Sequence, residues 1–353
     1  MSSDLIQFQN ITKTYGDTRA VDDVSFSIAD GEFLALVGPS GSGKSTTLRM
    51  LAGFDTPTTG RITLDGRSLN DVPPHKRDTT MVFQDYALFP HMTVGENIAF
   101  GLKRRGDSAD AIDSRIDEVL DLVDLGGLRD RNTATLSGGQ QQRVATARAL
   151  APEPKVLLMD EPLGALDKKL RDRIKVDFSR LQRELGITTL YVTHNQDEAL
   201  TMADRVAVMN NGEIEQLGPP EALYDRPKTR FVADFIGDTN FIDGTFTSRN
   251  GSVFLEAHGQ TFGTDVASLP GTNSTAFVRP ENIAISEPGN VTGENTLEAT
   301  VSQVHFVGSM IRYFVTVDDT EYIVETNSTD SRYETGDRVT MSWSAANTRV
   351  VDA

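Results

Sequence analysis

The string Gly-Pro-Ser-Gly-Ser-Gly-Lys-Ser at residues 38–45 constrains this chain more than any other feature of its sequence. It follows the apolar run of residues 33–37 and precedes residues 46–52, which contain no helix breaker before Gly53. A strand, a glycine-rich loop and a helix in this order are the context that the pattern G-x-x-x-x-G-K-[ST] requires. Glycines let consecutive backbone N–H groups turn inward, and the start of the helix adds partial positive charge at the same place. The string therefore predicts a site for the phosphates of a nucleoside triphosphate.

Lys44 and Ser45, the last two residues of the string, have side chains that can bind the phosphates and a metal ion. The Lys44 side chain can reach the β- and γ-phosphates, and the Ser45 hydroxyl can ligate Mg²⁺. The predicted phosphate site as a whole comprises Gly38, Pro39, Ser40, Gly41, Ser42, Gly43, Lys44, Ser45 and Thr46.

Length and composition limit the class of protein. A chain of 353 residues is too long for one typical core and suggests two domains, and its 38% of hydrophobic residues indicates a globular protein. No apolar run approaches the ~18 residues that cross a bilayer, and the first residues lack the basic and apolar segments of a signal peptide. We therefore expect the protein to stay in the cytoplasm. The absence of cysteine excludes disulfides and thiolate sites.

The chain is strongly acidic, with 51 Asp and Glu against 34 Lys and Arg and a net charge of −17. Such a charge repels nucleic acid at long range, so we expect no nucleic-acid partner. The acidity has two explanations, ordinary variation or adaptation to high salt, where screening tolerates the repulsion between like charges.

Short apolar segments alternate with helical ones over the first two thirds of the chain. This order is typical of an α/β domain with a mainly parallel sheet, in which ligands bind at the carboxyl ends of the strands. Four polar residues follow predicted strands and should lie near the phosphate loop, namely Gln84, Asp160, Glu161 and His194. The strands are predicted at residues 5–14, 24–28, 33–37, 60–64, 79–83, 156–159, 188–193, 206–209 and 214–217, and the helices at 46–52, 95–124, 136–150 and 168–185.

The character of the sequence changes after Gly237 and Asp238. Short alternating segments such as 252–255, 275–278 and 311–317 are separated by turn clusters, and no long helical period is visible. We predict a nucleotide-binding domain over residues 1–238 and a small β-barrel or sandwich over residues 239–353.

The acidic pair Asp160-Glu161 follows a predicted central strand. One carboxylate there would bind the Mg²⁺ held by Ser45, directly or through its surrounding shell, and the other could polarise the water that attacks the γ-phosphate. The alternative is an acidic pair that begins a solvated loop, which the upstream phosphate loop disfavours.

The string Leu-Ser-Gly-Gly-Gln at 136–140, with residues 141–150 after it, resembles the signature of the ATP-binding-cassette (ABC) ATPases. The resemblance covers residues 4–238 nearly continuously. It implies a RecA-like phosphate-loop α/β domain with antiparallel β and helical subdomains, which binds ATP with Mg²⁺ and hydrolyses it to ADP and phosphate. It also implies a homodimer, in which the signature of one subunit meets the γ-phosphate bound by the other. Ser137 would cap the helix, and Gly138 and Gly139, followed by Gln140, would leave its amides uncovered.

The same resemblance implies roles for the other site residues. Tyr15 would stack on the adenine, and Gln84 would link Mg²⁺ and the attacking water to the membrane partner. Glu161 would orient the water and His194 would contact the γ-phosphate, with Lys44 completing the catalytic set. Residues 163–167 would line the dimer interface.

The C-terminal region resembles the accessory oligonucleotide-fold-like (TOBE-type) domain of a subset of importers, through residues 278–283 and 336–343. The segment from Gln84 to Val94 resembles the surface that receives two integral-membrane permease subunits, and its apolar residues are expected to be exposed for that purpose. These likenesses place the protein on the cytoplasmic face of the cell membrane, with an extracytoplasmic solute-binding protein as an indirect partner.

The sequence of the ATPase indicates the transported solute only weakly, because this subunit does not bind the solute during passage. Residues 163–244 are most similar to spermidine/putrescine importers, and importers of ferric iron, thiamine, phosphonate or sugar remain alternatives. A soluble cassette ATPase of translation or DNA repair is disfavoured because the chain has one cassette and no heptad run. A nucleotide-sensing regulator is disfavoured because Lys44, Asp160, Glu161 and His194 are all present.

Overall fold

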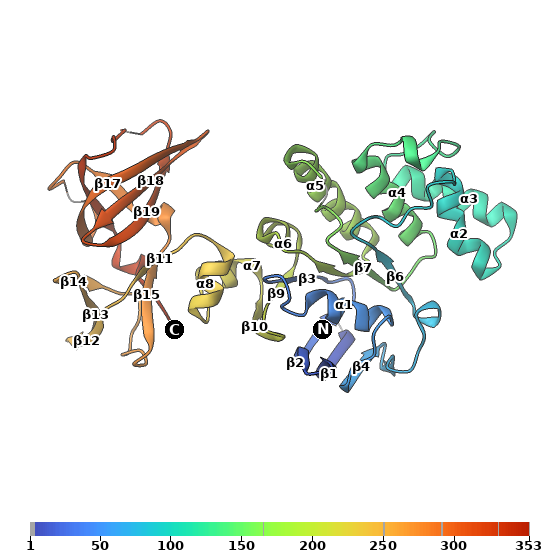
Figure 1. Cartoon of the computed structure of the whole chain (residues 1–353), viewed down its shortest axis with the longest axis horizontal. Coiled ribbons are helices and arrows are strands. Elements are labelled where there is room, and N and C mark those ends of the chain that lie inside the picture. Colours follow the sequence, from blue (N-terminus) through green and yellow to red (C-terminus); the bar gives the residue numbers. More distant parts are fainter. Residues whose placement is uncertain (1–3, 165, 250, 291, 331, 353) are drawn as a thin grey trace. The chain divides into compact units, whose positions relative to one another are not determined.

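A computed structural model of the chain describes residues 4–164, 166–249, 251–290, 292–330 and 332–352. The chain forms two compact units, residues 1–220 and 221–353 (Figure 1). The expected boundary between residues 238 and 239 remains a prediction. Within the described residues, no helix is long and apolar enough to cross a bilayer.

A six-stranded sheet forms the centre of the first unit, in the order β10-β9-β3-β8-β7-β6. All neighbouring strands are parallel except β10, which returns antiparallel to β9 after the turn at Asn211-Gly212. The strands are β3 (Phe33–Val37), β6 (Thr79–Val82), β7 (Val156–Asp160), β8 (Thr188–Val192), β9 (Arg205–Asn210) and β10 (Glu213–Gly218).

Both faces of this sheet are covered, because successive side chains along its strands enter two different cores. On β7, Leu157 and Met159 pack into one core with the helices α4 and α5, whereas Val156 and Leu158 pack into the other with α1 and a second sheet. That second sheet is antiparallel, in the order β2-β1-β4-β5, with β1 (Asp4–Tyr15), β2 (Thr18–Ala29), β4 (Thr59–Leu64) and β5 (Arg67–Ser68).

The helices of the first unit are α1 (Lys44–Ala52), α2 (Val94–Arg105), α3 (Ala109–Leu122), α4 (Gly138–Leu150), α5 (Lys168–Leu185) and α6 (Gln196–Met202). The single helical stretch predicted over residues 95–124 is wrong, because two helices occupy it. Gly106 ends α2 in the left-handed conformation with φ 88°, and the Ser108 hydroxyl caps the first turn of α3. Both are ordinary stop and start signals, so the sequence itself contains the break.

The second unit is antiparallel β over most of its length, as predicted. It contains sheets of order β11-β15-β21, β12-β13-β14 and β16-β20-β17-β18-β19, which enclose one hydrophobic core. The strands are β11 (Asn240–Ile242), β12 (Thr245–Arg249), β13 (Ser252–Ala257), β14 (Gln260–Gly263), β15 (Ser274–Val278), β16 (Ala284–Ser286), β17 (Asn295–Val307), β18 (Met310–Val317), β19 (Thr320–Asn327), β20 (Arg338–Trp343) and β21 (Arg349–Asp352).

Two short helices, α7 (Pro220–Asp225) and α8 (Arg230–Ile236), precede these strands and were not predicted. The buried Arg279 guanidinium attaches both of them to the β domain. It donates hydrogen bonds to the carbonyl oxygens of Ala233 and Gly237 at the end of α8, at 2.9 and 2.8 Å, and to that of Tyr224 in α7, at 3.0 Å. A cation at the carboxyl end of a helix is also favoured by the helix dipole.

Candidate nucleotide-binding and hydrolysis site

The phosphate loop lies between β3 and α1, at the carboxyl edge of the six-stranded sheet, as the sequence predicts. Gly38 and Gly43 have left-handed φ angles of 154° and 99°. A Cβ at Gly38 would lie 2.1 Å from the carbonyl oxygen of Met209 in β9, and one at Gly43 would lie 2.5 Å from that of Ala20. Only glycine fits at these two positions, so the loop is seated against β9 and β2.

The first turn of α1 is open for an anion. Gly43 occupies the cap position, and no side chain accepts a hydrogen bond from the helix amides there. These amides and the helix dipole favour a phosphate at this point. Pro39, Ser40 and Gly41 form the exposed rim of the loop, whereas Ser42 is buried.

Lys44 lies almost fully buried inside the loop. Its Nζ donates to the carbonyl oxygens of Gly38 and Pro39, both at 2.8 Å. Burial lowers the pKa of the Lys44 ammonium, and the nearby carboxylates of Glu161 and Asp160 oppose that shift. Because the hydrogen-bond acceptors of Lys44 Nζ are neutral carbonyl oxygens, its positive charge is suited to binding an anionic ligand.

Ser45 and Asp160 bring together the two groups predicted to hold Mg²⁺. Ser45 Oγ donates to Asp160 Oδ1 at 3.0 Å, which joins α1 to the end of β7. Among the described residues, no cluster of three or more His, Cys, Asp or Glu forms a complete metal cage. One carboxylate and one hydroxyl fit Mg²⁺, because this ion keeps several waters and is shared with substrate phosphates.

Glu161 and His194 form a second pair at the same edge of the sheet. His194 Nδ1 lies 3.0 Å from Glu161 Oε2, and the Glu161 amide donates to the carbonyl oxygen of Val192 at the end of β8, at 2.9 Å. Glu161 is in the left-handed conformation with φ 46°, which is uncommon for a residue with a side chain. Since backbone strain of this kind is found at functional sites, it supports a special task for the Glu161 carboxylate.

Gln84 and Tyr15 lie at the margins of this group. Gln84 follows β6, whose end pairs with β7 at Val82 and Met159, so it leaves the sheet at the same edge as Asp160, with its side chain exposed. The Tyr15 ring is 45% exposed, with Lys13 Nζ 4.7 Å from its centroid and Thr46 close to its hydroxyl. Tyr15 is therefore partly exposed beside the start of α1, with the Lys13 ammonium over its ring.

The signature string forms the start of α4, with Ser137 as its N-cap. Ser137 and Gln140 make a reciprocal capping box, in which each side chain accepts from the other residue's amide. Gly138 is exposed as expected, but Gly139 is buried, and a Cβ there would lie 2.9 Å from Leu170 Cδ2 in α5. The second glycine thus allows close packing of α4 against Leu170, and its role in leaving the amides uncovered stays a prediction.

Within the described residues of a single chain, no hydrogen bond or ion pair joins residues 137–140 to the phosphate loop. The structure therefore brings together Lys44, Ser45, Asp160, Glu161 and His194, and the described side-chain hydrogen bonds of Ser137 and Gln140 are made within the signature string itself. Of the predicted interface segment at 163–167, Ala165 lies outside the described residues.

The segment from Gln84 to Val94 is less exposed than expected. Tyr86 is 7% exposed and Val94 is fully buried, because both pack into the core around α2 and α4. The exposed members of the segment are Gln84, Asp85, Ala87, Pro90 and His91. Any partner at this surface would thus meet exposed polar side chains together with the half-buried apolar side chains of Leu88, Phe89 and Met92.

Arg148 of α4 holds this segment in place, and the sequence analysis did not identify it. Its guanidinium donates to the carbonyl oxygens of Tyr86 and Ala87 at 2.8 and 2.7 Å. Both acceptor residues are in the left-handed conformation, with φ of 61° and 45°. No local sequence pattern predicts these contacts, because Tyr86 and Ala87 precede Arg148 by 62 and 61 residues in the sequence.

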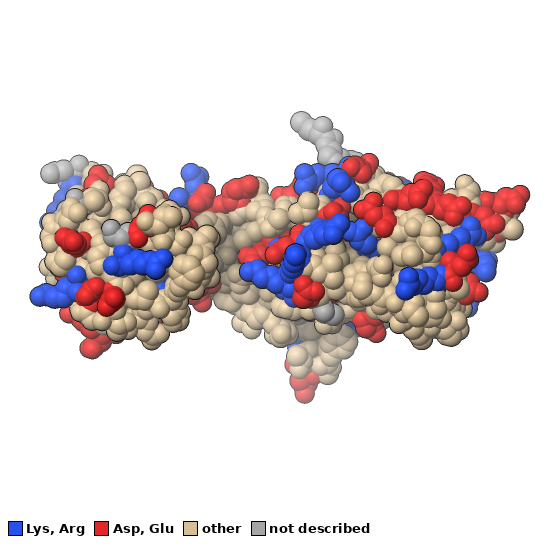
Figure 2. All heavy atoms as spheres, turned by 90° about the horizontal axis from the view of Figure 1, so that it is seen from above, with Lys and Arg blue, Asp and Glu red and all other residues tan. Residues whose placement is uncertain are grey.

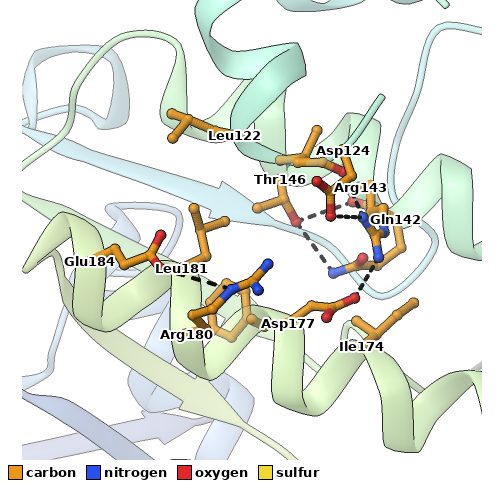
Figure 3. A pocket seen from close by; sticks show the side chains of 12 residues that line it. Leu122, Asp124, Gln142, Arg143, Thr146, Ile174, Asp177, Arg180, Leu181 and Glu184 are labelled. Atoms are coloured by element: carbon orange, nitrogen blue, oxygen red, sulfur yellow. Dashed lines mark hydrogen bonds and ion pairs between the residues drawn. The ribbon is translucent and has the colours of Figure 1, made fainter. Parts of the chain in front are cut away.

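A hollow between α3, α4 and α5 lies away from the phosphate loop (Figure 3). Arg143 projects into it from α4 and pairs with Asp124 and with Asp177 of α5. The charged groups that line the hollow are thus paired with one another, and the ion pair between Arg143 and Asp177 joins α4 to α5.

The fold and these contacts define the first unit as a phosphate-loop nucleotide-binding domain. Residues 21–164 match the family described as ABC transporter, and residues 276–351 match the TOBE domain. A spermidine/putrescine import ATP-binding protein, PotA, of Rubrobacter xylanophilus is 46% identical over 349 residues, which cover 96% of this chain and 92% of that protein. An uncharacterized ABC transporter ATP-binding protein of Escherichia coli, YdcT, is 43% identical over 96% of each chain.

Solved structures agree with these relatives. The cassette MJ0796, described as dimeric in a post-hydrolysis state bound to ADP and Pi, is 34% identical, with a TM-score of 0.55 over 61% of this chain and 98% of that one. The protein cbiO1 of Clostridium perfringens is 32% identical, with a TM-score of 0.59 over 63% of this chain and 91% of that one. The chain belongs to the ABC transporter family of ATP-binding proteins, and it is an ABC transporter ATPase with a C-terminal TOBE domain.

Proposed function

We propose that this ATPase powers the import of polyamines such as spermidine and putrescine through a membrane permease. The observation that carries the ATPase chemistry is the meeting of Ser45 with Asp160 and of Glu161 with His194 at one edge of the sheet. The full-length likeness to PotA proteins supports the solute, since it extends through both units of the chain.

The proposed catalytic unit contains two copies of the chain. Each ATP lies between residues 38–46 of one copy and residues 137–140 of the other, with the adenine on Tyr15. Lys44 and the amides at the start of α1 offset the phosphate charge, and the start of α4 approaches the γ-phosphate from the second copy. This arrangement accounts for the separation of the two motifs within one chain.

The residues at the end of β7 and β8 carry the hydrolytic step in this proposal. Ser45 and Asp160, with Gln84, would hold Mg²⁺, and the ion would neutralise charge on the phosphates. Glu161 accepts a proton from the attacking water, and His194 hydrogen-bonds both Glu161 and the γ-phosphate. Loss of the γ-phosphate removes the contact between copies, so the halves part and the permease resets.

The proposed partners are two permease subunits at the segment from Gln84 to Val94, with Arg148 holding that segment. Because the permease spans the membrane, the ATPase sits at its cytoplasmic face, and a solute-binding protein on the other side delivers the polyamine. Nucleic acid has no part in the proposal, in keeping with the net charge of −17.

The test is ATP-dependent uptake into liposomes that contain the complex of this ATPase with its co-purified permease and solute-binding protein. We expect uptake of radiolabelled spermidine or putrescine, and its loss with Glu161→Gln, together with a fall in ATP hydrolysis of about 10²- to 10⁴-fold. Glu184→Gln, an exposed Glu on α5, is the control and should behave as the parent. Uptake of ferric iron, thiamine, phosphonate or sugar instead would show that polyamines are not the transported solute. Undiminished ATP hydrolysis by Glu161→Gln would contradict the proposed catalytic role of Glu161.

We also propose that the acidity is an adaptation to a cytoplasm of high salt. Acidic side chains gather over the part of the molecule that holds α2 and α3 (Figure 2). On α3 and just beyond it, the exposed carboxylates are Asp110, Asp113, Asp117, Glu118, Asp121 and Asp124. Arginines pair with Asp113, Asp117, Glu118 and Asp124, so the prediction rests on the net charge of −17 of the whole chain. Since salt screens the repulsion that this net charge produces, the melting temperature should rise from low to molar KCl. A melting temperature that stays constant or falls would exclude this adaptation.

A further inference from the structure

The turn that carries His194 rests on a buried carboxylate, that of Glu198 in α6. Glu198 is 2% exposed, and its Oε2 accepts hydrogen bonds from Tyr191 Oη at 2.7 Å and Thr193 Oγ1 at 2.8 Å. Both donors belong to the strand end that leads into His194. A carboxylate so buried is costly unless its oxygens are satisfied, so these bonds fix its place firmly.

Glu198 is connected to the residues on both sides of His194. Thr193 Oγ1, which donates to Glu198, also accepts from the Asn195 amide at 2.9 Å. The Asn195 side chain in turn accepts from the Glu198 amide at 3.4 Å. The backbone before and after His194 is thus held by Glu198, whereas the imidazole itself is exposed and touches Glu161.

The other oxygen of Glu198 faces α5. Arg171 Nε lies 3.8 Å from Glu198 Oε1, which is beyond hydrogen-bond distance, and this buried Nε has no hydrogen-bond partner among the described residues. Another nitrogen of the same guanidinium, Nη2, donates to the carbonyl oxygen of Leu166 at 2.7 Å. One planar guanidinium therefore lies between the Glu198 carboxylate and the Leu166 carbonyl oxygen.

We propose that Glu198 is a positioning residue for hydrolysis, which holds the His194 turn against Glu161 and couples it through Arg171 to the segment 163–167. The inference rests on the proposed role of His194. A small shift of Leu166 would move Arg171, since the guanidinium is planar and its donors keep a fixed geometry. Closing the 3.8 Å gap would give the orphaned Nε its hydrogen bond and tighten the His194 turn. A partner that moved Leu166 would in this way change the position of His194 relative to Glu161.

Glu198→Gln tests the link to Arg171 with little change of shape. The Gln oxygen can still accept from Tyr191 and Thr193, but its NH₂ group then faces Arg171 Nε, donor against donor. We expect kcat for ATP hydrolysis by the full chain to fall about 10- to 100-fold, with a much smaller rise in KM for ATP, because a misplaced His194 disturbs the reacting centre but only one contact to the bound γ-phosphate. Thr193→Val should act in the same direction. Thr189→Val is the matched control, since Thr189 is a buried threonine of β8, the strand before Thr193, and its hydroxyl donates to the carbonyl oxygen of Ile187 instead.

Two readouts separate positioning from mere stability. The chain has 5 histidines, so the His194 imidazole signal can be assigned by comparison with His194→Ala and should shift in Glu198→Gln but not in Thr189→Val. In a double-mutant cycle, Glu198→Gln should add nothing to His194→Ala if it acts through His194. Additive losses, an unmoved imidazole signal, or a parent-like kcat in Glu198→Gln would each overturn the inference. A parent-like kcat in His194→Ala itself would instead overturn the proposed role of His194.

Discussion

Ser45 Oγ lies 3.0 Å from Asp160 Oδ1, although the two residues are 115 positions apart in the sequence. The contact joins the first turn of the phosphate-loop helix to the end of a central strand. It places a hydroxyl and a carboxylate side by side, at the edge of the sheet where Lys44, Glu161 and His194 also lie.

If this pair holds Mg²⁺, Ser45→Ala and Asp160→Asn should raise the Mg²⁺ concentration that half-saturates ATP hydrolysis by about 10- to 100-fold. The measurement is phosphate release at fixed ATP over a Mg²⁺ titration. Asp172→Asn alters an exposed carboxylate that pairs with Lys175 on the same helix, and should leave the titration unchanged. Parent-like Mg²⁺ dependence in both site variants would place the ion elsewhere.

The Asp160 carboxyl should cost the free protein stability at neutral pH. Burial, aided by the nearby Glu161 carboxylate, raises the pKa of Asp160 above its ordinary value, although the Ser45 hydrogen bond opposes the shift. The folded state therefore favours the protonated form, so the cost appears as pH rises through the folded pKa and vanishes below the ordinary value.

Asp160→Asn should accordingly melt at a higher temperature than the parent at pH 7 in the absence of nucleotide and Mg²⁺. The gain is about 2–4 °C for each 1 kcal/mol relieved, and it should shrink as the pH falls toward the ordinary pKa of aspartate. Melting curves of both proteins over this pH range check the sign. A gain that grew toward acid pH would contradict the raised pKa.

Ala87 should prefer to be glycine, because its φ of 45° is unfavourable for a residue with a Cβ. Ala87→Gly is expected to stabilise the chain by roughly 0.5–1 kcal/mol in denaturant unfolding. The same change at Ala111, exposed in the first turn of α3, should destabilise it by up to about 1 kcal/mol. Opposite signs of the change in unfolding free energy for these two Ala→Gly variants would establish that the backbone at Ala87, which Arg148 holds, is strained.

The second unit should need its two helices to be stable. A chain of residues 239–353 lacks the Ala233, Gly237 and Tyr224 carbonyls, so it leaves the buried Arg279 with few acceptors. We expect it to be less stable than residues 221–353 by about 3 kcal/mol, measured by urea unfolding. Arg279→Ala should destabilise the longer chain and have little effect on the shorter one. Equal stability of the two chains would favour the boundary between residues 238 and 239.

The phosphate loop and the strand order around it could be predicted because their signals are local. The glycines at 38–43, the run at 156–159 and the acidic pair after it lie within short windows, and the parallel sheet follows from their alternation with helices. The break between α2 and α3 also has local signals, Gly106 and Ser108, but they lie within a long polar stretch that favours one helix.

The supporting contacts have no such signal. Arg148, Arg171 and Arg279 each bind backbone carbonyls of distant segments, and a carbonyl has no residue type to recognise. Gly139 looked like a bare helix start, and only the placement of α5 shows that Leu170 covers it. Such contacts depend on the packing of whole elements, which a sequence pattern does not specify.

The wedging of Gly38 against the Met209 carbonyl bears on how nucleotide is captured. A loop fixed by its neighbours has few conformations to lose, so little ordering entropy opposes the entry of a triphosphate. Ordering of the loop should then take little of the binding free energy, which in the proposed two-copy arrangement remains available to draw the two subunits together.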